Sequence, residues 1–265
     1  MIIVEKETMV EIPTLHVVEA DLKDLSDIPT VFFLHGFTSA KEHNLHVAYL
    51  LAEQGIRVIL PDALHHGERE DDVSNNEKKL ALSFWEIVLT SIGELSALKE
   101  LLVESGRADR NRIGVIGTSM GAITTLGALS QYPWIQSAVS LMGTAYYQQF
   151  AKAQVDMMEK QGVPIDEGMK ELVLSKLQPF DLSSQLEKLA SKPLLIWHGK
   201  QDQVVPSYFS EQLYQSVQQQ YQHTPEHLKL IVEEKTGHKV SRHAVLQAVQ
   251  WFNQHLIKEK QSAMS

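Results

Sequence analysis

The sequence predicts an α/β protein in which helices cover both faces of a doubly wound, mostly parallel sheet. Short apolar runs rich in β-branched residues alternate with longer segments of helical periodicity, as in repeated strand–helix–strand units. The chain has 265 residues, of which 43% are apolar and 22% charged, as in ordinary globular proteins. We therefore expect residues 1–265 to form one large domain with a single helical insertion.

Six apolar runs are the candidate strands of the parallel part of the sheet. Most of their positions are apolar without alternation, which suits strands that are buried on both faces. The runs cover residues 31–34, 57–60, 113–116, 138–142, 193–197 and 228–232. Residues 2–20 instead mix charged and apolar positions, which predicts an antiparallel pair at the edge of the sheet.

The segments between these runs carry the helical pattern. In the longest, about residues 77–105, apolar residues recur at spacings of three and four and mark one buried face. The helix that follows Ser119 is rich in small residues and stops before Pro133, which cannot continue it. Further helices are expected at about 41–54, 207–219 and 240–258.

About fifty residues separate the run that ends at Met142 from the run that begins at Pro193, too many for an ordinary crossover. Two helical pieces, about 145–160 and 166–177, are divided by Gly162-Val163-Pro164. We expect residues 143–182 to form a lid over the carboxyl edge of the sheet. The alternative is a pair of packing helices far from any site.

Two apolar side chains in this insertion, Phe150 and Met157, are candidates for contact with a substrate. Adaptable apolar groups suit a lid that faces an acyl chain. The alternative is that they only fasten the lid to the sheet.

Composition excludes several function classes. There are no cysteines, which rules out a disulfide framework, a cysteine nucleophile and thiolate metal sites. The 24 basic and 33 acidic residues give a net charge of −9, so nucleic-acid binding is not expected. No apolar stretch approaches the roughly 18 residues of a spanning helix, so we expect no membrane partner and a cytoplasmic location. The oligomeric state stays open.

The sequence Gly117-Thr118-Ser119-Met120-Gly121 is the strongest functional signal. It follows the run 113–116 and opens a helix, which is the context of a nucleophile held on a sharp strand-to-helix turn. A glycine two residues to either side relieves crowding at such a turn. These features make Ser119 the candidate nucleophile, although a bare G-x-S-x-G pattern also arises by chance.

Asp202 and His238 are the candidate partners of Ser119. A serine needs a base to become a good nucleophile, and groups at the carboxyl ends of neighbouring parallel strands converge. Asp202 follows the run 193–197, and His238 follows the run 228–232. The competitors lie before the last strand, within a helical pattern, or in or beside the insertion: His223, His227, His243, His255, Asp166 and Asp181.

Two backbone N–H groups are expected to bind the oxyanion of the tetrahedral intermediate. One belongs to Met120, directly after the nucleophile, and the other to Phe37 in the loop that follows the run 31–34. The Phe37 side chain is then free to line the acyl pocket, or packs in the core. His65-His66 and the pair His43 and His46 lack a third ligand at suitable spacing, so no metal is expected.

These motifs together resemble the α/β-hydrolase superfamily, and above all its small bacterial carboxylesterases of the prolyl-oligopeptidase-like and dienelactone-hydrolase-like branch. The resemblance implies the α/β-hydrolase fold and ester hydrolysis through an acyl-enzyme, without a cofactor. A dienelactone hydrolase proper has cysteine as its nucleophile, and this chain has serine. The motifs that carry the resemblance are His35-Gly36-Phe37, Pro61-Asp62, His66-Gly67-Glu68-Arg69, Gly117–Gly121, His198-Gly199 through Asp202 to Val205-Pro206, and Gly237-His238.

The sequence therefore predicts a serine hydrolase that cleaves small-molecule carboxylic esters with short acyl groups. Thioester or amide hydrolysis by the same residues is one alternative. A non-catalytic protein that keeps the fold as a ligand-binding scaffold is the other.

Overall fold

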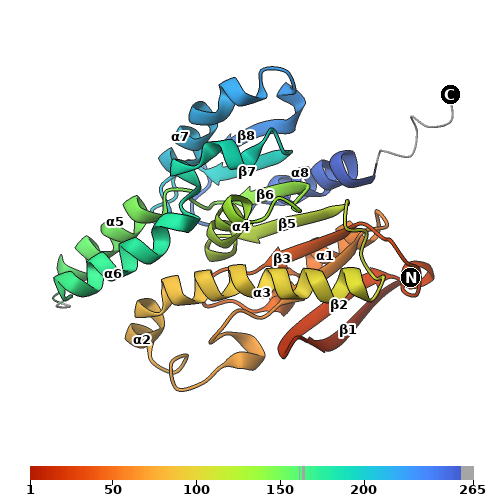
Figure 1. Cartoon of the computed structure of the whole chain (residues 1–265), viewed down its shortest axis with the longest axis horizontal. Helices are drawn as coiled ribbons and strands as arrows, with labels where there is room; N and C mark the ends of the chain where they lie inside the picture. The colour runs from red at the N-terminus through yellow and green to blue at the C-terminus, as the bar shows by residue number, and fades with distance from the viewer. Residues whose placement is uncertain (161, 163–164, 258–265) are drawn as a thin grey trace.

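A computed structural model describes residues 1–160, 162 and 165–257 (Figure 1). Eight strands form one sheet in the order β1-β2-β4-β3-β5-β6-β7-β8. The strands are β1 (Ile2–Met9), β2 (Ile12–Glu19), β3 (Thr30–Leu34), β4 (Arg57–Pro61), β5 (Ile113–Thr118), β6 (Ser137–Leu141), β7 (Leu194–Gly199) and β8 (Leu228–Glu233). The α-helices are α1 (Leu45–Ala52), α2 (Glu77–Leu82), α3 (Phe84–Glu104), α4 (Met120–Gln131), α5 (Tyr147–Lys160), α6 (Glu167–Leu177), α7 (Tyr208–Val217) and α8 (Arg242–Phe252).

The predicted fold class is confirmed, with a sheet that is parallel from β4 to β8. The segment 2–20 forms the expected antiparallel pair, because β1 pairs with β2 in opposite directions, and β2 also pairs antiparallel with β4. The parallel strands place all their carboxyl ends at one edge of the sheet. Loops that follow these ends can therefore build one site.

Strand β3 shows why the apolar runs become buried strands. Side chains of successive residues point to opposite faces, so Val31 and Phe33 join the apolar cluster under α1 and α8, whereas Phe32 and Leu34 join the larger cluster under α3 and α4. All four are nearly inaccessible to solvent. The sheet is thus the middle layer of three.

Two helical segments differ from the expectation. The predicted helix at 77–105 is interrupted at Ser83, whose N–H donates to the carbonyl oxygens of both Lys79 and Leu80 and tightens the last turn of α2. The predicted helix at 41–54 begins with a 3₁₀ turn over Lys41–Asn44, and α1 starts only at Leu45.

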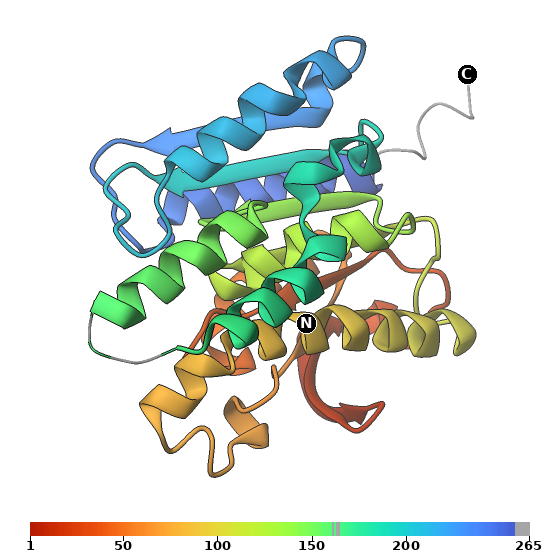
Figure 2. The ribbon, with the colours of Figure 1, turned by 60° about the vertical axis from the view of Figure 1, so that its left-hand side comes forward.

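The insertion between β6 and β7 contains the two expected helices, α5 and α6. Figures 1 and 2 show them as a pair that projects past the edge of the sheet where the parallel strands end. Val163 and Pro164, which were expected to divide the helices, lie outside the described residues. None of the helices in the described parts of the chain has the length and apolar character that a bilayer crossing requires.

Candidate active site

Ser119 occupies the sharp turn between β5 and α4. Its φ of 53° and ψ of −113° are costly for any residue other than glycine, so surrounding contacts must hold the turn. The Ser119 N–H donates to the carbonyl oxygen of Leu141 on the neighbouring strand (2.9 Å), and its own carbonyl accepts from the N–H of Ile123 (2.9 Å). The turn is therefore fastened to the sheet on one side and to the helix on the other.

The two glycines that flank Ser119 are required by close backbone contacts. A Cβ on Gly117 would lie 2.0 Å from the carbonyl oxygen of Gly121, and a Cβ on Gly121 would lie 2.0 Å from the carbonyl oxygen of Leu34. No side chain fits at either position without moving the backbone. The start of α4 therefore packs directly against the end of β3.

Ser119, His238 and Asp202 form a continuous chain of hydrogen bonds. The Ser119 hydroxyl lies 2.9 Å from Nε2 of His238, and Nδ1 of His238 lies 2.6 Å from Oδ2 of Asp202. A proton on Nδ1 donates to the carboxylate and leaves Nε2 free to accept the serine proton. The structure thus brings together the three side chains that the sequence placed after β5, β7 and β8.

The loops that carry Asp202 and His238 are joined through their backbones. The N–H of Lys200 donates to the carbonyl of Glu233 (2.9 Å), and the N–H of Gln201 donates to the carbonyl of Thr236 (2.9 Å). Gly199 permits this contact, because a Cβ there would lie 2.4 Å from the Thr236 carbonyl oxygen. The relative position of Asp202 and His238 is therefore fixed by contacts between main-chain groups.

Asp202 is a buried carboxylate with many donors. Burial by itself would raise the pKa of Asp202, but hydrogen bonds from His198, His238 and the N–H groups of Val205 and Val204 outweigh it and hold the pKa far below its ordinary value. Asp202 is therefore an anion around neutral pH. Such an anion orients the imidazole and stabilises its protonated form.

The backbone N–H groups of Phe37 and Met120 are the two expected oxyanion donors. Phe37 lies in the loop after β3, and Met120 is the first residue of α4. Within the described part of the chain, neither N–H has a hydrogen-bond acceptor. The ring of Phe37 is half-buried and packs edge-on against His66 and Phe84, with centroids 5.6 Å apart in both pairs.

Sequence comparisons identify the family to which this site belongs. Residues 91–259, well over half of the chain, match the prolyl oligopeptidase family (Peptidase_S9). Over 258 residues the chain is 47% identical to a Bacillus subtilis protein named "Putative esterase YitV", and 33% identical to the esterase YjfP of Escherichia coli. Each match covers 97% of this chain and the whole of the relative. The chain belongs to the prolyl oligopeptidase family.

Solved structures support the same fold for this family member. TT1662 from Thermus thermophilus superposes with a TM-score of 0.77 at 20% identity, covering 97% of this chain and 99% of that one. The acylaminoacyl peptidase of Pyrococcus horikoshii superposes with a TM-score of 0.71 at 18% identity, over 97% of this chain but only 42% of the peptidase. The predicted resemblance to α/β-hydrolases is confirmed, and the chain is a hydrolase.

His198 is a buried residue of the site for which the sequence pattern predicted no catalytic role. Its Nε2 donates to the carbonyl of Val205 (2.7 Å) and lies 3.3 Å from Oδ2 of Asp202, and its Nδ1 contacts the hydroxyl of Ser210 (2.7 Å). It supports the loop that carries Asp202. The available signal was the His198-Gly199 pair at the end of an apolar run.

The competing histidines and aspartates lie away from Ser119. His227 contacts the carbonyl of Ser191, and His243 contacts Glu233. His255 packs on Trp251 with ring centroids 4.3 Å apart, and His223 is exposed. The carboxylates of Asp166 and Asp181 cap helical turns by accepting backbone N–H groups.

The two candidate lid contacts have different surroundings. Phe150 is buried among aromatic rings, 6.3 Å from Trp85 and 5.9 Å from Phe209 between centroids. Met157 lies two turns further along α5, where the helix has left the body of the protein, and 62% of it is exposed. A substrate contact of either residue stays a prediction.

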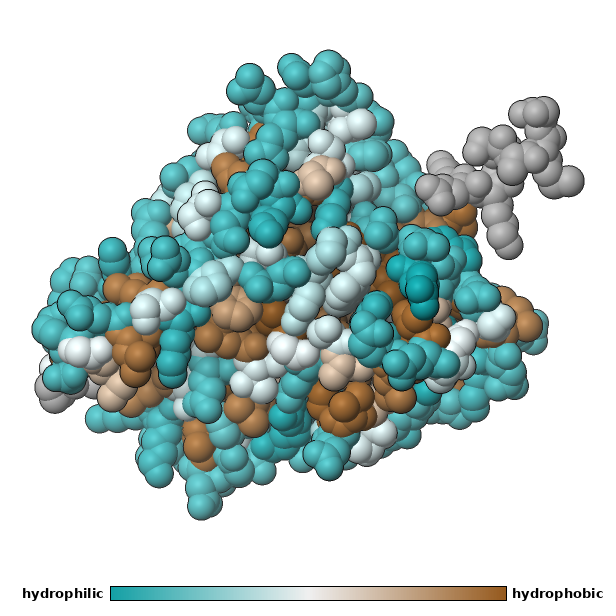
Figure 3. Space-filling view, viewed as in Figure 1, coloured by the Kyte–Doolittle hydropathy of each residue, from teal (hydrophilic) through white to brown (hydrophobic). Residues whose placement is uncertain are grey.

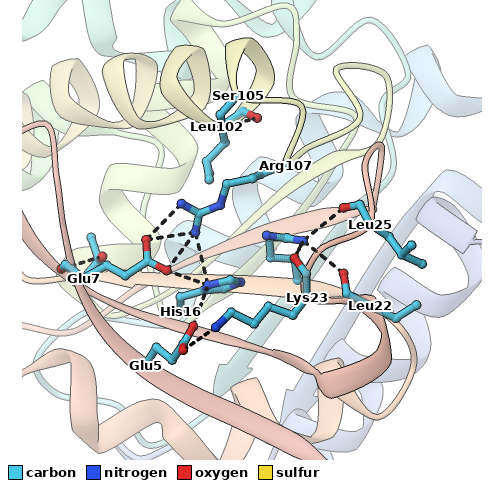
Figure 4. Close-up of polar contacts among 11 residues, drawn as sticks. Glu5, Glu7, His16, Leu22, Lys23, Leu25, Leu102, Ser105 and Arg107 are labelled. Atoms are coloured by element: carbon cyan, nitrogen blue, oxygen red, sulfur yellow. Dashed lines mark hydrogen bonds and ion pairs between the residues drawn. The ribbon is translucent and has the colours of Figure 1, made fainter.

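The structure also assembles one group of potential metal ligands outside the active site, in the described residues: Glu5, Glu7 and His16 on the β1–β2 hairpin (Figure 4). The two carboxylates already form ion pairs with basic side chains of the chain. Arg107 forms a two-pronged pair with Glu7 at 2.9–3.0 Å, and Lys23 contacts Glu5 at 2.6 Å. The group is an ion-pair network that ties the hairpin to the segment after α3.

Proposed function

We propose that this hydrolase is a carboxylesterase acting on small, soluble esters with short acyl groups. Ser119 is the nucleophile, His238 the general base and Asp202 the residue that orients it. The observation that carries the proposal is the pair of consecutive hydrogen bonds, 2.9 Å from Ser119 to His238 and 2.6 Å from His238 to Asp202. A serine linked in this way to a base and an anion is equipped for acyl transfer.

In the first half of the reaction, the Ser119 oxygen attacks the ester carbonyl carbon while its proton passes to Nε2 of His238. The N–H groups of Phe37 and Met120 stabilise the oxyanion, and each such donor contributes about 3 kcal/mol to lowering the barrier. The intermediate collapses when the carbon–oxygen bond to the alcohol breaks and His238 protonates the leaving alkoxide. An acyl-enzyme remains on Ser119.

In the second half, water takes the place of the alcohol. His238 accepts a proton from the water as its oxygen attacks the acyl carbon, and the same two N–H groups hold the second oxyanion. Return of the proton to the Ser119 oxygen releases the carboxylic acid. Apart from the substrate and this water, every step uses only groups of this chain.

We include in the proposal that residues 1–265 form one catalytic domain and that residues 143–182 act as its lid. Support for the lid comes from an apolar pocket of about 300 Å³ between the insertion and the start of α3. Its lining includes Trp85, Val155, Met158, Met169 and Val173. Figure 3 shows further apolar surface on the projecting α5–α6 pair.

The preference for short acyl groups is supported by the aromatic side chains between this pocket and the oxyanion loop. Phe37 contacts Phe84, which contacts Trp85 with ring centroids 5.3 Å apart. A long acyl chain from Ser119 would have to displace these rings to enter the pocket. A series of p-nitrophenyl esters from acetate to dodecanoate tests this, and an optimum of kcat/KM at the long end would contradict it.

The decisive experiment for the function is labelling with a fluorophosphonate probe. We expect one label per chain at Ser119, lost in Ser119→Ala and kept in Ser105→Ala, a remote serine control. Hydrolysis of p-nitrophenyl butyrate should disappear with the label. An unlabelled parent protein with no turnover would favour a ligand-binding role instead.

Thioester and amide hydrolysis are the rival activities, because the same residues can transfer an acyl group from either. A panel with one acyl group on oxygen, sulfur and nitrogen leaving groups separates them. We expect the oxygen ester to have the largest kcat/KM. A larger value for the anilide would assign peptidase-like activity.

A further inference from the structure

The loop that carries the proposed oxyanion donor is a strained turn. The N–H of Ser39 donates to the carbonyl of Gly36 (3.2 Å), which closes a β-turn over Phe37 and Thr38. Thr38 has a φ of 58°, in the left-handed region where a β-branched residue is disfavoured. Its side chain is exposed, so packing of that side chain does not hold the strain.

Two buried histidines bind the peptide groups of this turn. Nδ1 of His35 donates to the carbonyl of Gly36 (2.8 Å), while its Nε2 accepts the N–H of Ala63 (3.0 Å). Nε2 of His66 accepts the N–H of Thr38 (3.0 Å), while its Nδ1 donates to the carbonyl of Leu64 (2.8 Å). Each ring thus joins the loop after β3 to the loop after β4.

These contacts define the charge and tautomer of both rings. An Nε2 that accepts an amide proton carries no proton itself, and an Nδ1 that faces a carbonyl must carry one. Both rings are therefore neutral, with the proton on Nδ1. Burial lowers the pKa of His35 to about 4 and also lowers the pKa of His66, which keeps both rings neutral around pH 7.

The bond from His35 also sets the direction of the Phe37 N–H. The Gly36 carbonyl and the Phe37 N–H belong to one planar trans peptide and point in opposite directions. Because His35 holds the carbonyl, the N–H is directed away from His35. Gly36 borders Ser119, since a Cβ on Gly36 would lie 3.7 Å from Cβ of Ser119.

The loop after β4 is a firm support for both rings. Asp62 is buried and forms an ion pair with the buried side chain of Lys41, and its carboxylate also accepts the N–H groups of Lys41 and Glu68 (3.0 Å each). The rings of His35 and His66 lie 5.3 Å apart between centroids. The turn is thus braced by elements that do not depend on substrate.

We propose that His35 and His66 are positioning residues, which act as a pair of neutral bridges that hold the 36–39 turn and aim the Phe37 N–H at the oxyanion. The inference rests on the proposed function, because it assigns the donor of that same site. Neither ring touches the reacting atoms. Their effect is exerted through the direction of one backbone N–H.

The experiment compares His66→Leu with His66→Gln. Leucine removes the acceptor for the Thr38 N–H, whereas the side-chain oxygen of glutamine can replace it. We expect His66→Leu to lower kcat by about 10- to 100-fold with KM changed less than about threefold, somewhat less than the loss of a whole oxyanion donor. His66→Gln should stay within about fivefold of the parent. His46→Gln, an exposed histidine on α1, is the matched control and should leave kcat unchanged.

A second readout separates aiming of the donor from general loss of structure. A trifluoromethyl ketone forms a hemiketal with Ser119 and places an oxyanion in the hole, so its Ki should rise in His66→Leu by the same factor as kcat/KM falls. Adding Thr38→Gly, which removes the cost of the positive φ, should restore at least a third of the lost factor on a logarithmic scale. This double variant also tests the inference if His66→Leu alone folds poorly.

Three results would overturn the inference: kcat of His66→Leu within twofold of the parent, an unchanged ketone Ki, or no rescue by either glutamine or Thr38→Gly. Each of them is compatible with full Ser119-dependent activity in the parent. Absence of that activity would instead overturn the proposed function, and this inference with it.

Discussion

The candidate active site is built from two pairs of loops that differ in how they provide chemistry. The loops after β7 and β8 present side chains, Asp202 and His238, to the nucleophile. The loops after β3 and β4 present a backbone N–H, that of Phe37, and use side chains only to hold it. In the proposed mechanism, one pair supplies groups that exchange protons, and the other supplies a fixed backbone dipole.

Both pairs of loops contain histidines, but the electrostatic surroundings of these histidines differ. The side chain of His238 is 23% exposed and lies 2.6 Å from the Asp202 carboxylate, which would stabilise the imidazolium of the proposed mechanism. His35 and His66 are buried and are bound only through main-chain groups. The groups around an imidazole ring, rather than the residue type alone, therefore decide whether the ring can gain a proton.

The largest expected effect tests the first pair of loops. His238→Ala removes the base, and kcat should fall by about a millionfold, as in other serine hydrolases that lose their histidine. Steady-state hydrolysis of p-nitrophenyl butyrate, with the fluorophosphonate label as a count of sites, measures it. Turnover within tenfold of the parent would remove His238 from the mechanism.

Asp202→Asn should lower kcat by about 10⁴-fold, because an amide favours the wrong tautomer of His238 and cannot stabilise its cation. Asp109→Asn is the control, because Asp109 precedes the amino end of β5 and so lies at the edge of the sheet opposite the loop after β7. Because the Asp202 pKa is held far below its ordinary value, protonation of this carboxylate should not produce an acidic limb of its own in the parent's kcat profile. A second acidic limb near pH 4 that disappears in Asp202→Asn would contradict this.

A smaller effect tests the second pair through stability. The His35 pKa of about 4 in the fold lies below its ordinary 6.5, so the unfolded chain binds more protons between these values. The contribution of neutral His35 is fully present above pH 6.5 and is lost as the pH falls toward 4, by about 3 kcal/mol in total. Urea unfolding of the parent and His35→Asn measures it. The variant should lose less stability on acidification, whereas parallel pH dependences would show that His35 is not held neutral.

The sequence sufficed for the sheet because β3, β4, β5, β6 and β7 are buried on both faces and so appear as largely apolar runs. The edge strand β8 is only partly buried, with Lys229 exposed, but it keeps four apolar positions. The sequence also sufficed to choose the residues that now lie together. Ser119, Asp202 and His238 each follow the carboxyl end of a parallel strand. Convergence at one edge is a property of the fold class and needs no further information.

The bracing of the oxyanion loop could not be predicted in the same way. The bonds from His35 and His66 join two turns that have no periodicity, and their tautomers depend on which amide or carbonyl lies opposite each nitrogen. The sequence pattern also gives no indication of the break between α2 and α3 at Ser83, because the apolar positions on either side keep helical spacing. The predicted helix at about 145–160 matches α5, but the sequence does not indicate where that helix leaves the body of the protein.

The contact of Gly121 with the end of β3 has a consequence for how far this site can be altered. The proposed nucleophile and the loop that carries the proposed oxyanion donor lie on two segments that touch main chain to main chain, with no side chain as a spacer. The distance between the two segments at this contact is therefore set by the radii of backbone atoms. Substitutions that seek new substrates have room at the rings of Phe37, Phe84 and Trp85 and in the pocket under the insertion. They have almost none where Gly121 meets the end of β3.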